Sequence, residues 1–281
     1  AFAQVRPQGQ RNPETRTIDL TYVVEEGPRV YVEKINVVGN TRTLDHVIRR
    51  EFDLEEGDAY NKVLIDKAER RLNALGFFKR VRITNEPGSA PDKVVVNVIV
   101  EDQPTGQFSI AGGYSTSDGF LAEIGVTESN FLGRGQRVRI SGSTGQYTKG
   151  IEFSFTEPFF LGYRLAAGID LFSKYSDNVR TAAYVLESTG GTLRLGVPIT
   201  DEFSIGTRYS LFTQRISVPN TTKRPYSDCT TPTNPVSTGP GADGIAGTVD
   251  DITCLTNGEA SVAVKQAQGR TLTSLIGLSA I

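Results

Sequence analysis

The chain has 281 residues, with 30 Lys and Arg against 32 Asp and Glu and a formal net charge of -2. This length is enough for two domains, and the near-neutral charge argues against a nucleic-acid-binding protein, which normally carries a basic face. No run of about 18 apolar residues occurs, so no transmembrane helix is predicted, although a barrel strand needs only about 10 alternating residues. Because the chain starts at Ala1 and contains no Met, we expect that a signal peptide or upstream domains have been removed.

The first third of the chain has a charged, mixed character. Thr17–Val24 predicts a strand, and Gly27-Pro28 ends it. A second unit begins with a strand over Val30–Val38, closed by the turn pair Gly39-Asn40. A short helix is expected from Leu44 to Phe52.

A longer helix follows, with Asn61 as its N-cap and Gly76 as its stop signal. Its apolar residues recur at spacings of three and four, which gives one buried stripe. Strands are expected over Arg80–Thr84 and Val94–Val100. The sequence therefore predicts a small α+β domain of about 75 residues, just large enough to hold a core, in the order strand, helix, helix, strand, strand.

After Pro104 the helical period disappears and apolar residues alternate with a period of two. The alternation slips near Gly190-Gly191, which predicts a bulge there. We count eight strands with little helix between them, an all-β signal: Gln107–Tyr114, Phe120–Thr127, Arg137–Ser143, Ile151–Thr156, Arg164–Phe172, Tyr184–Val197, Phe203–Gln214 and Thr271–Ala280.

Two features favour a membrane barrel over a soluble sandwich, which would also alternate. Aromatic residues gather where strands end, as an interfacial girdle would: Phe131, Phe159, Phe160 and Tyr163. The polar face carries charges of both signs, which suits a wet lumen: Arg137, Arg139, Glu152, Arg164, Asp170, Arg194 and Arg208.

The lengths of the connections give a further indication. If the first of these strands runs outward, the connections 130–136, 158–163 and 199–202 lie on the inner side and are short. The long segment Ser217–Gly269 then lies on the outer side. Short periplasmic turns and long outer loops are typical of transmembrane barrels.

The long segment contains the two cysteines, Cys229 and Cys254. They form no CxxC pair and the single histidine, His46, is distant in sequence, so a disulfide in an oxidising compartment is favoured over a zinc site. Asp243, Asp250 and Asp251 supply oxygen ligands suited to Ca²⁺, but their spacing fits no twelve-residue calcium loop. We therefore expect no metal and an ordinary polar outer loop.

Enzymatic chemistry finds little support in the sequence. No catalytic constellation can be assembled from the sequence. It contains one histidine, and it lacks a phosphate-binding glycine loop after a strand, an HExxH motif and a nucleophile elbow. We expect a protein without a catalytic site or cofactor.

Several segments resemble, in the same order, the BamA family of outer-membrane β-barrel assembly proteins. The resemblance covers nearly the whole chain except Ser217–Gly269. It is carried by Tyr31–Asn40 with Thr41-Arg42-Thr43, Val47–Phe52, Arg71–Phe78 (RLNALGFF), Thr105–Phe108, Gly112–Tyr114, Asn130–Gly135 (NFLGRG) and Glu157–Phe160.

This resemblance implies an architecture and a location. Residues 1–28 would be the tail of a preceding POTRA domain, and residues 29–103 the last POTRA domain, with the β-α-α-β-β fold. Residues 104–281 would be the N-terminal strands, roughly eight, of an antiparallel transmembrane β-barrel. The barrel would lie in the bacterial outer membrane and the POTRA domain in the periplasm. A partial barrel leaves two exposed sheet edges.

The resemblance also implies a function, an assembly factor that folds and inserts client barrels without ATP by accepting a client strand at its first barrel strand. Glycine and small residues make this strand a weak edge. From the residues alone, glycine that relieves crowding at a barrel bend is an equal alternative, and the resemblance favours the client-binding strand. The strand comprises Gln107, Phe108, Ser109, Ile110, Ala111, Gly112, Gly113 and Tyr114.

A second surface is expected on the small domain, where Arg49, Arg50 and Glu51 occupy a short helix. They could bind a periplasmic lipoprotein subunit through charge complementarity, although such a run is more often a solvated helix face. The implied partners are unfolded outer-membrane clients, these lipoproteins and outer-membrane lipid.

Two alternatives stay open. One is a related TamA-like assembly factor or two-partner-secretion transporter. The other is a passive porin-like channel, which is disfavoured because a porin has no need of an N-terminal POTRA domain.

Overall fold

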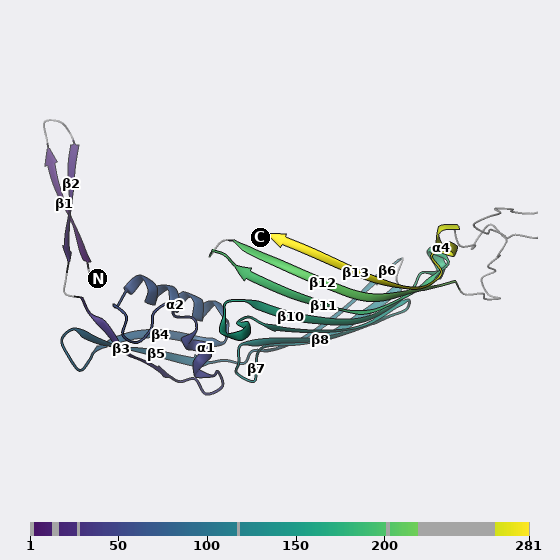
Figure 1. Ribbon diagram of the computed structural model, residues 1–281, viewed down its shortest axis with the longest axis horizontal. Coiled ribbons are helices and arrows are strands. Elements are labelled where there is room, and N and C mark those ends of the chain that lie inside the picture. The colour runs from purple at the N-terminus through teal and green to yellow at the C-terminus, as the bar shows by residue number, and fades with distance from the viewer. Residues whose placement is uncertain are drawn as a thin grey trace, which may run out of the picture. The chain divides into compact units, whose positions relative to one another are not determined.

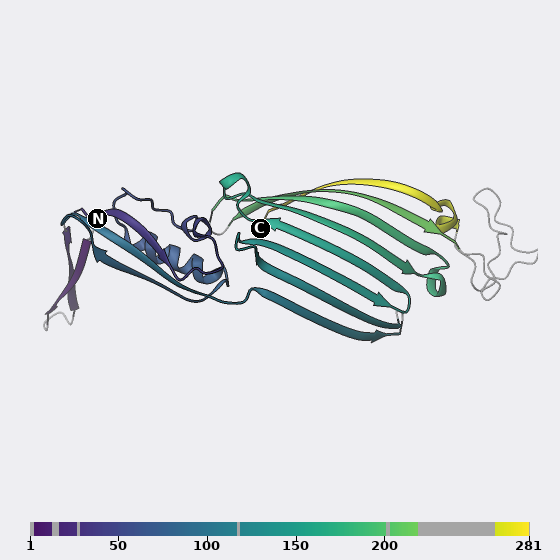
Figure 2. The same cartoon turned by 90° about the horizontal axis from the view of Figure 1, so that it is seen from below.

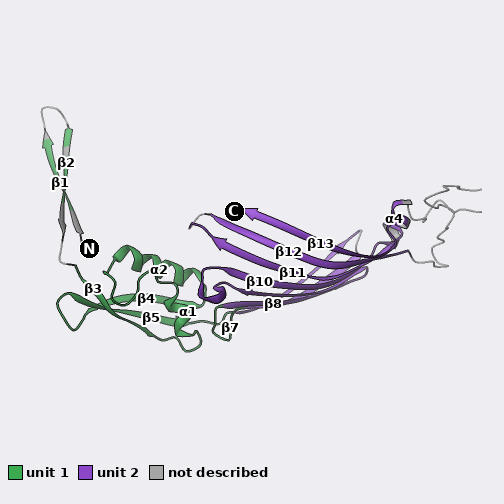
Figure 3. Cartoon of the chain, in the orientation of Figure 1, with its two compact units in different colours: residues 1–105, 129–135 green, residues 106–128, 136–281 purple. Residues whose placement is uncertain are grey.

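The computed structural model describes residues 3–12, 17–26, 29–116, 119–200, 203–218 and 262–280. The chain forms two compact units, residues 1–105 with 129–135 and residues 106–128 with 136–281 (Figure 3). In the first unit, β1 (Ala3–Asn12) and β2 (Thr17–Glu26) form a two-stranded antiparallel hairpin. The sequence predicted only the second of these strands, and their assignment to a preceding POTRA domain stays a prediction.

The small domain, residues 29–105, has the predicted order of elements. They are β3 (Tyr31–Val38), α1 (Asp45–Arg49), α2 (Lys62–Ala74), β4 (Phe78–Pro87) and β5 (Lys93–Asp102) (Figure 1). The sheet order is β3-β5-β4, with β5 parallel to β3 and antiparallel to β4. The α+β prediction is therefore confirmed.

Helix α2 supplies much of the core of the small domain. The side chain of Asn61 accepts a hydrogen bond from the Val63 N–H at 3.0 Å, which caps the first turn. Gly76 ends the helix with a φ of +70°, a conformation that glycine adopts without strain. The buried stripe of Ile65, Ala68 and Leu72 belongs to one core cluster with the alternating valines of β5.

Helix α1 is shorter than predicted. It covers Asp45–Arg49, and Arg50 forms its C-cap. Glu51 therefore lies beyond the helix and not on the solvated face that its charge suggested.

The second unit contains one antiparallel sheet of eight strands, which Figure 2 shows as a single curved layer. Each strand pairs with its neighbours in the chain, in the order β13-β12-β11-β10-β9-β8-β7-β6. The eight predicted strands are all present: β6 (Gly106–Ser115), β7 (Gly119–Phe131), β8 (Gln136–Gly145), β9 (Thr148–Glu157), β10 (Ala166–Asp177), β11 (Val185–Pro198), β12 (Ser204–Ser217) and β13 (Gly269–Ala280).

One face of this sheet is apolar and is not covered by a second layer of the described residues. Ile110 and Tyr114 of β6 are 71% and 77% exposed, and Ile276 of β13 is 75% exposed. A soluble sandwich would bury such a face against a second sheet. An exposed apolar face is instead what a lipid-facing barrel wall requires.

The bulge predicted at Gly190-Gly191 is wrong. The register of β11 with both β10 and β12 runs through these residues without a shift. The face of β11 that carries Leu193 changes character toward the other end of the strand, where Glu187 lies opposite Arg215. Gly190 itself leaves room for Phe212, because a Cβ at position 190 would overlap the Phe212 side chain.

The predicted short connections are confirmed. Phe131 to Gln136 joins β7 to β8, Glu157 to Ala166 joins β9 to β10 through a 3-10 turn at Phe160–Gly162, and Pro198 to Ser204 joins β11 to β12. At the opposite end, α3 (Val179–Ala182) lies between β10 and β11, and α4 (Val262–Gln266) precedes β13. None of the helices in the described part of the chain is long and apolar enough to cross a membrane.

Candidate functional site

The edge strand β6 is the first candidate site. Within the described residues β7 is its only hydrogen-bonded neighbour, and β13 forms the opposite edge of the sheet. A strand with one neighbour presents unpaired backbone N–H and C=O groups, which can accept another strand. All eight residues predicted as the client-binding strand, 107–114, lie in β6.

The packing of β6 is sparse. Each of the residues 106–114 is exposed. A Cβ added at Gly113 would meet no atom within 4 Å, and one at Gly112 would lie 3.8 Å from the Leu121 carbonyl oxygen. Among the described residues these glycines relieve no crowding, so no steric need for glycine is seen within this part of the chain.

The apolar face of β6 is continuous with that of β7. Ile110 lies directly opposite Ile124, Phe108 opposite Val126, and Tyr114 opposite Phe120. Such cross-strand pairs contribute roughly 0.2–1 kcal/mol each. On the other face Ser109 pairs with Gly125, and its hydroxyl donates to the Gly125 carbonyl oxygen at 3.3 Å. The side-chain contacts between β6 and β7 therefore lie mainly on the apolar face of the sheet.

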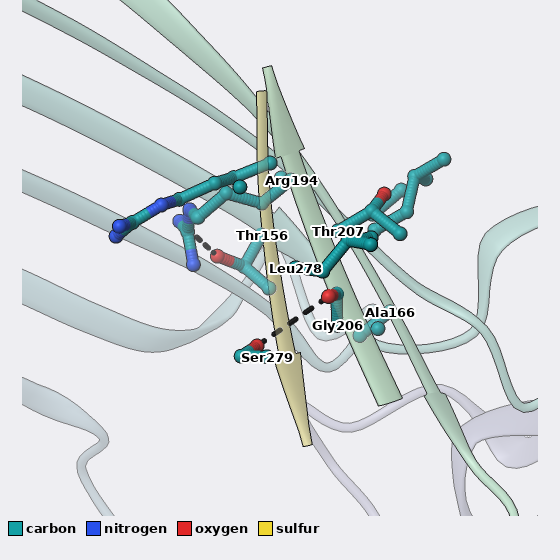
Figure 4. A pocket seen from close by; sticks show the side chains of 13 residues that line it. Thr156, Ala166, Arg194, Gly206, Thr207, Leu278 and Ser279 are labelled. Carbon is teal, nitrogen blue, oxygen red and sulfur yellow. Dashed lines mark hydrogen bonds between the residues drawn. The ribbon is translucent and has the colours of Figure 1, made fainter. Parts of the chain in front are cut away.

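The polar face of the sheet carries an organised charge network in the middle strands. Arg194 of β11 donates to both carboxylate oxygens of Asp170 on β10, with Nε–Oδ2 and Nη2–Oδ1 distances of 2.6 and 2.8 Å. Its Nη2 also lies 3.2 Å from the hydroxyl of Thr156 on β9 (Figure 4) and 3.2 Å from the hydroxyl of Ser154 on the same strand. The Arg194 guanidinium thus links the side chains of three neighbouring strands, β9, β10 and its own strand β11.

Glycines next to this network leave room for the arginines. A Cβ at Gly168 would lie 3.0 Å from Arg194 Nη2, and one at Gly277 would lie 2.6 Å from Arg208 Nε. Together these residues line a hollow of about 370 Å³ that also includes Ser279. Charged walls of this kind suit a water-filled lumen.

Of the three residues predicted to bind a partner, Glu51 is only 6% exposed. Its carboxylate lies 3.9 Å from the Nε of Arg50, whose side chain is also largely buried. Arg49 is partly exposed and bonds Asp45 at 2.5 Å, a contact that raises the pKa of the guanidinium. The docking role stays a prediction, but only Arg49 offers a partner much surface.

The predicted Cys229–Cys254 disulfide and the aspartates 243, 250 and 251 lie outside the described residues. Within the described ranges, no group of three or more His, Cys, Asp or Glu side chains could hold a metal ion. The absence of a catalytic site stays a prediction.

A cluster that sequence reasoning missed lies inside the first unit. Asn130 and Thr43 are buried, and the Asn130 amide donates to the Thr43 hydroxyl at 2.9 Å. Thr43 in turn donates to Asp102 at 2.8 Å. In the sequence, residues 41–43 and 130–135 are parts of the family resemblance, and residues 130–136 are a predicted short connection, but neither observation indicated that the two segments are in contact.

Two family models match the chain. The Omp85 superfamily domain matches residues 130–280, and the POTRA model, described as a surface antigen variable number repeat, matches residues 30–102. The first match covers the sheet from the end of β7 to β13, and the second covers the small domain.

Curated relatives match over most of the chain. An outer membrane protein assembly factor BamA from Neisseria meningitidis is 28% identical over 81% of this chain, and one from Neorickettsia risticii is 30% identical over 76%. The chain spans 29% of the length of each of these relatives.

Among solved structures, BamA from Haemophilus ducreyi lacking POTRA domains 1–3 is similar, with a TM-score of 0.63 and 28% sequence identity. The match covers 79% of this chain and 43% of that one. The resemblance to BamA and the predicted fold, a POTRA domain followed by part of an antiparallel barrel, are confirmed.

Proposed function

Because the chain belongs to the Omp85 superfamily, we propose that the protein of which it is part assembles β-barrel proteins in the outer membrane. The BamA relatives carry this function in their names, outer membrane protein assembly factor. The superfamily domain and the POTRA match identify an outer-membrane protein with a periplasmic POTRA domain.

In this proposal β6 accepts the client. A client strand adds to the open edge by β-augmentation, in which main-chain hydrogen bonds supply affinity and alternate side chains supply selectivity. The observation that carries the proposal is the sparse packing of β6, which is exposed along residues 106–114 and has room at Gly112 and Gly113. The side chains of Phe108 and Ile110 extend the apolar face of the sheet to its edge. Apolar side chains of an added client strand can then continue this face.

The proposed reaction uses neither ATP nor a cofactor. A client strand in lipid must satisfy its backbone groups within protein, and each strand that pairs moves apolar side chains from water to lipid. Folding of the client therefore supplies the free energy, and the assembly factor lowers the kinetic barrier. The proposed partners are unfolded outer-membrane proteins and periplasmic lipoprotein subunits.

Site-specific crosslinking tests this function in the full-length protein. Cys229 and Cys254 are first replaced with Ser, and single cysteines are then introduced as Ile110→Cys in β6 and Ile169→Cys in β10. Both positions lie on the same type of face, but β10 has neighbours on both sides. During assembly, a cysteine in a client's terminal strand should crosslink to position 110 and not to position 169. Equal yields at the two positions would contradict client capture at β6.

A further inference from the structure

The turn between β7 and β8 belongs to the compact unit of the small domain. Residues 129–135 group with residues 1–105, whereas the strands on either side group with the sheet (Figure 3). This turn, called the 129–135 turn below, also has the sequence NFLGRG over most of its length. Its contacts show why it groups with the small domain.

A chain of hydrogen bonds joins the turn to the small domain through buried side chains. Asn130 is 8% exposed and Thr43 is 2% exposed. The Asn130 amide nitrogen donates to the Thr43 hydroxyl oxygen at 2.9 Å, and that hydroxyl donates its single proton to Asp102 at 2.8 Å. The Asn130 carbonyl oxygen accepts from the Gly135 N–H at 2.8 Å. Asn130 therefore uses one end of its amide to shape the turn and the other to hold the small domain.

Backbone contacts reinforce the same junction. The Leu44 N–H donates to the Gly133 carbonyl oxygen at 2.9 Å. Gly133 has a φ of +72°, and a Cβ there would overlap the Arg42 carbonyl oxygen. Gly135 has a φ of +70°, and a Cβ there would overlap the Arg50 guanidinium. Gly133 is required both by its backbone conformation and by its close approach to backbone, whereas Gly135 is favoured mainly by its backbone conformation, because its neighbour is the end of a flexible side chain.

Asp102 links this junction to the start of the edge strand. It ends β5, three residues before Thr105, and it accepts hydrogen bonds from the Arg42 N–H at 2.7 Å and the Thr41 hydroxyl at 3.2 Å. The Ser129 N–H donates to the Thr105 carbonyl oxygen at 3.4 Å. The β6–β7 hairpin thus leaves the small domain at Thr105 and returns to it at Ser129.

We propose that the 129–135 turn makes the small domain hold both ends of the β6–β7 hairpin, with Asn130 as the positioning residue. A displacement of the small domain is then transmitted to the edge strand at two points and not only through the covalent link at residues 103–105. The consequence for client capture rests on the proposed function, whereas the attachment itself does not.

An ordinary tight turn is the competing explanation. Such a turn needs only the local Asn130–Gly135 hydrogen bond. The Asn130–Thr43 bond joins residues 87 positions apart and is buried. Removing a buried hydrogen bond so that a polar group loses its partner costs free energy. The loss of the Asn130–Thr43 bond should therefore weaken the attachment of the hairpin to the small domain.

Amide hydrogen exchange in the full-length protein tests the attachment. Asn130→Ala should accelerate exchange in residues 106–110 and 125–131 by about tenfold, the factor that corresponds to a typical buried hydrogen-bond loss. Asn130→Ala also removes the local bond from the Gly135 N–H, and Thr43→Val also removes the bond to Asp102, but both variants lose the Asn130–Thr43 bond. Thr43→Val leaves the local turn bond in place and should still accelerate exchange in the hairpin, and the double variant should show less than the sum of the two effects. Asn36→Ala is the matched control, because it removes the 3.1 Å Asn36–Asn97 bond of the small domain without touching the turn.

The outcomes separate the two proposals. Unchanged hairpin exchange in Asn130→Ala, or equal acceleration in Asn36→Ala, would overturn the attachment. The same variants carrying Ile110→Cys report client capture, and Asn130→Ala should reduce the crosslink yield several-fold. Normal crosslinking in the Ile110→Cys protein with no response to Asn130→Ala would leave the proposed function standing and overturn the coupling. Absence of crosslinking in Ile110→Cys alone would contradict the proposed function, while the exchange data would still decide the attachment.

Discussion

Arg194 of β11 donates two hydrogen bonds, of 2.6 and 2.8 Å, to the carboxylate of Asp170 on β10. Both side chains are partly exposed, so solvent screening lowers the contribution of the pair. Its two-point geometry and the additional hydroxyl contacts on β9 nevertheless make it stronger than a single surface ion pair.

We therefore predict that Asp170→Asn lowers the free energy of unfolding of the full-length protein by about 1 kcal/mol. The midpoint of urea-induced loss of the folded, heat-modifiable band on a gel measures this. Glu187→Gln is the control, because Glu187 lies 3.8 Å from Arg215 and both side chains are exposed. The control should shift the midpoint by less than half as much. A larger shift in Glu187→Gln would contradict the assigned importance of the Arg194 network.

The second prediction concerns acid. Burial opposes ionisation of Asp102 and is the largest single influence on it. Hydrogen bonds from the Arg42 N–H and from the hydroxyls of Thr43 and Thr41 together outweigh burial and hold the pKa of Asp102 below its usual value. An unfolded aspartate has a pKa of about 3.9.

The folded state therefore binds fewer protons than the unfolded state in the range between these two pKa values. The stabilising contribution of Asp102 is present above about pH 4 and is lost as the pH falls through the folded-state pKa. Glu56, whose pKa is lowered by the Ile35 N–H, acts in the same direction. Thermal unfolding of the small domain, followed from pH 7 to pH 3, should show a falling midpoint. Asp102→Asn should flatten that dependence without abolishing it, and an unchanged slope would contradict the role of Asp102.

Much of the fold could be predicted from residue patterns because those patterns act locally. The Asn61 cap, the Ile65–Leu72 stripe and the Gly76 stop define α2 within one stretch of chain. Period-two alternation likewise located all eight strands of the sheet. Strand neighbours follow from short connections, which bring consecutive antiparallel strands together.

What could not be predicted depends on contacts between distant residues. The Asn130–Thr43 bond joins residues 87 positions apart, and asparagine and threonine are residue types that do not by themselves indicate burial. Glu51 belongs to a charged run that is usually solvated, yet the early end of α1 places it in the interior. Near Gly190-Gly191 the alternation is interrupted because the face that carries Leu193 becomes polar at Glu187, opposite Arg215, and from the sequence alone this interruption predicts a bulge. Only the uninterrupted pairing of β11 with β10 and β12 excludes the bulge.

The third prediction compares two glycines with nearly the same backbone conformation. Gly133 and Gly76 have φ values of +72° and +70°. A Cβ at Gly76 would meet nothing within 4 Å, whereas one at Gly133 would overlap the Arg42 carbonyl oxygen. Gly76→Ala should therefore cost only the left-handed strain, about 1–2 kcal/mol.

Gly133→Ala adds a backbone overlap to that strain, so the 129–135 turn must move away from the small domain. Its effect should appear as faster amide exchange at Leu44, whose N–H donates to the Gly133 carbonyl oxygen. Gly76→Ala should leave exchange at Leu44 close to wild type. Equal exchange at Leu44 in the two variants would show that the close approach at Gly133 is unimportant.

The last prediction concerns the weak packing of the edge strand. Gly112 in β6 and Gly142 in β8 lie on the apolar face, opposite Ala122 and Ile151. A Cβ would lie 3.8 Å from a carbonyl oxygen at Gly112 and 4.0 Å at Gly142, so both sites have room at Cβ. Valine at either position raises the strand preference by up to about 1 kcal/mol.

If sparse packing at the edge is needed for strand exchange with a client, only Gly112→Val should slow client assembly. The expected reduction in rate is about fivefold, the factor that corresponds to roughly 1 kcal/mol. Folding of a client barrel into liposomes by each full-length variant measures this rate. Equal rates for Gly112→Val and Gly142→Val would mean that Gly112 has no part in client exchange, because the two substitutions differ mainly in whether they lie in the proposed client-binding strand.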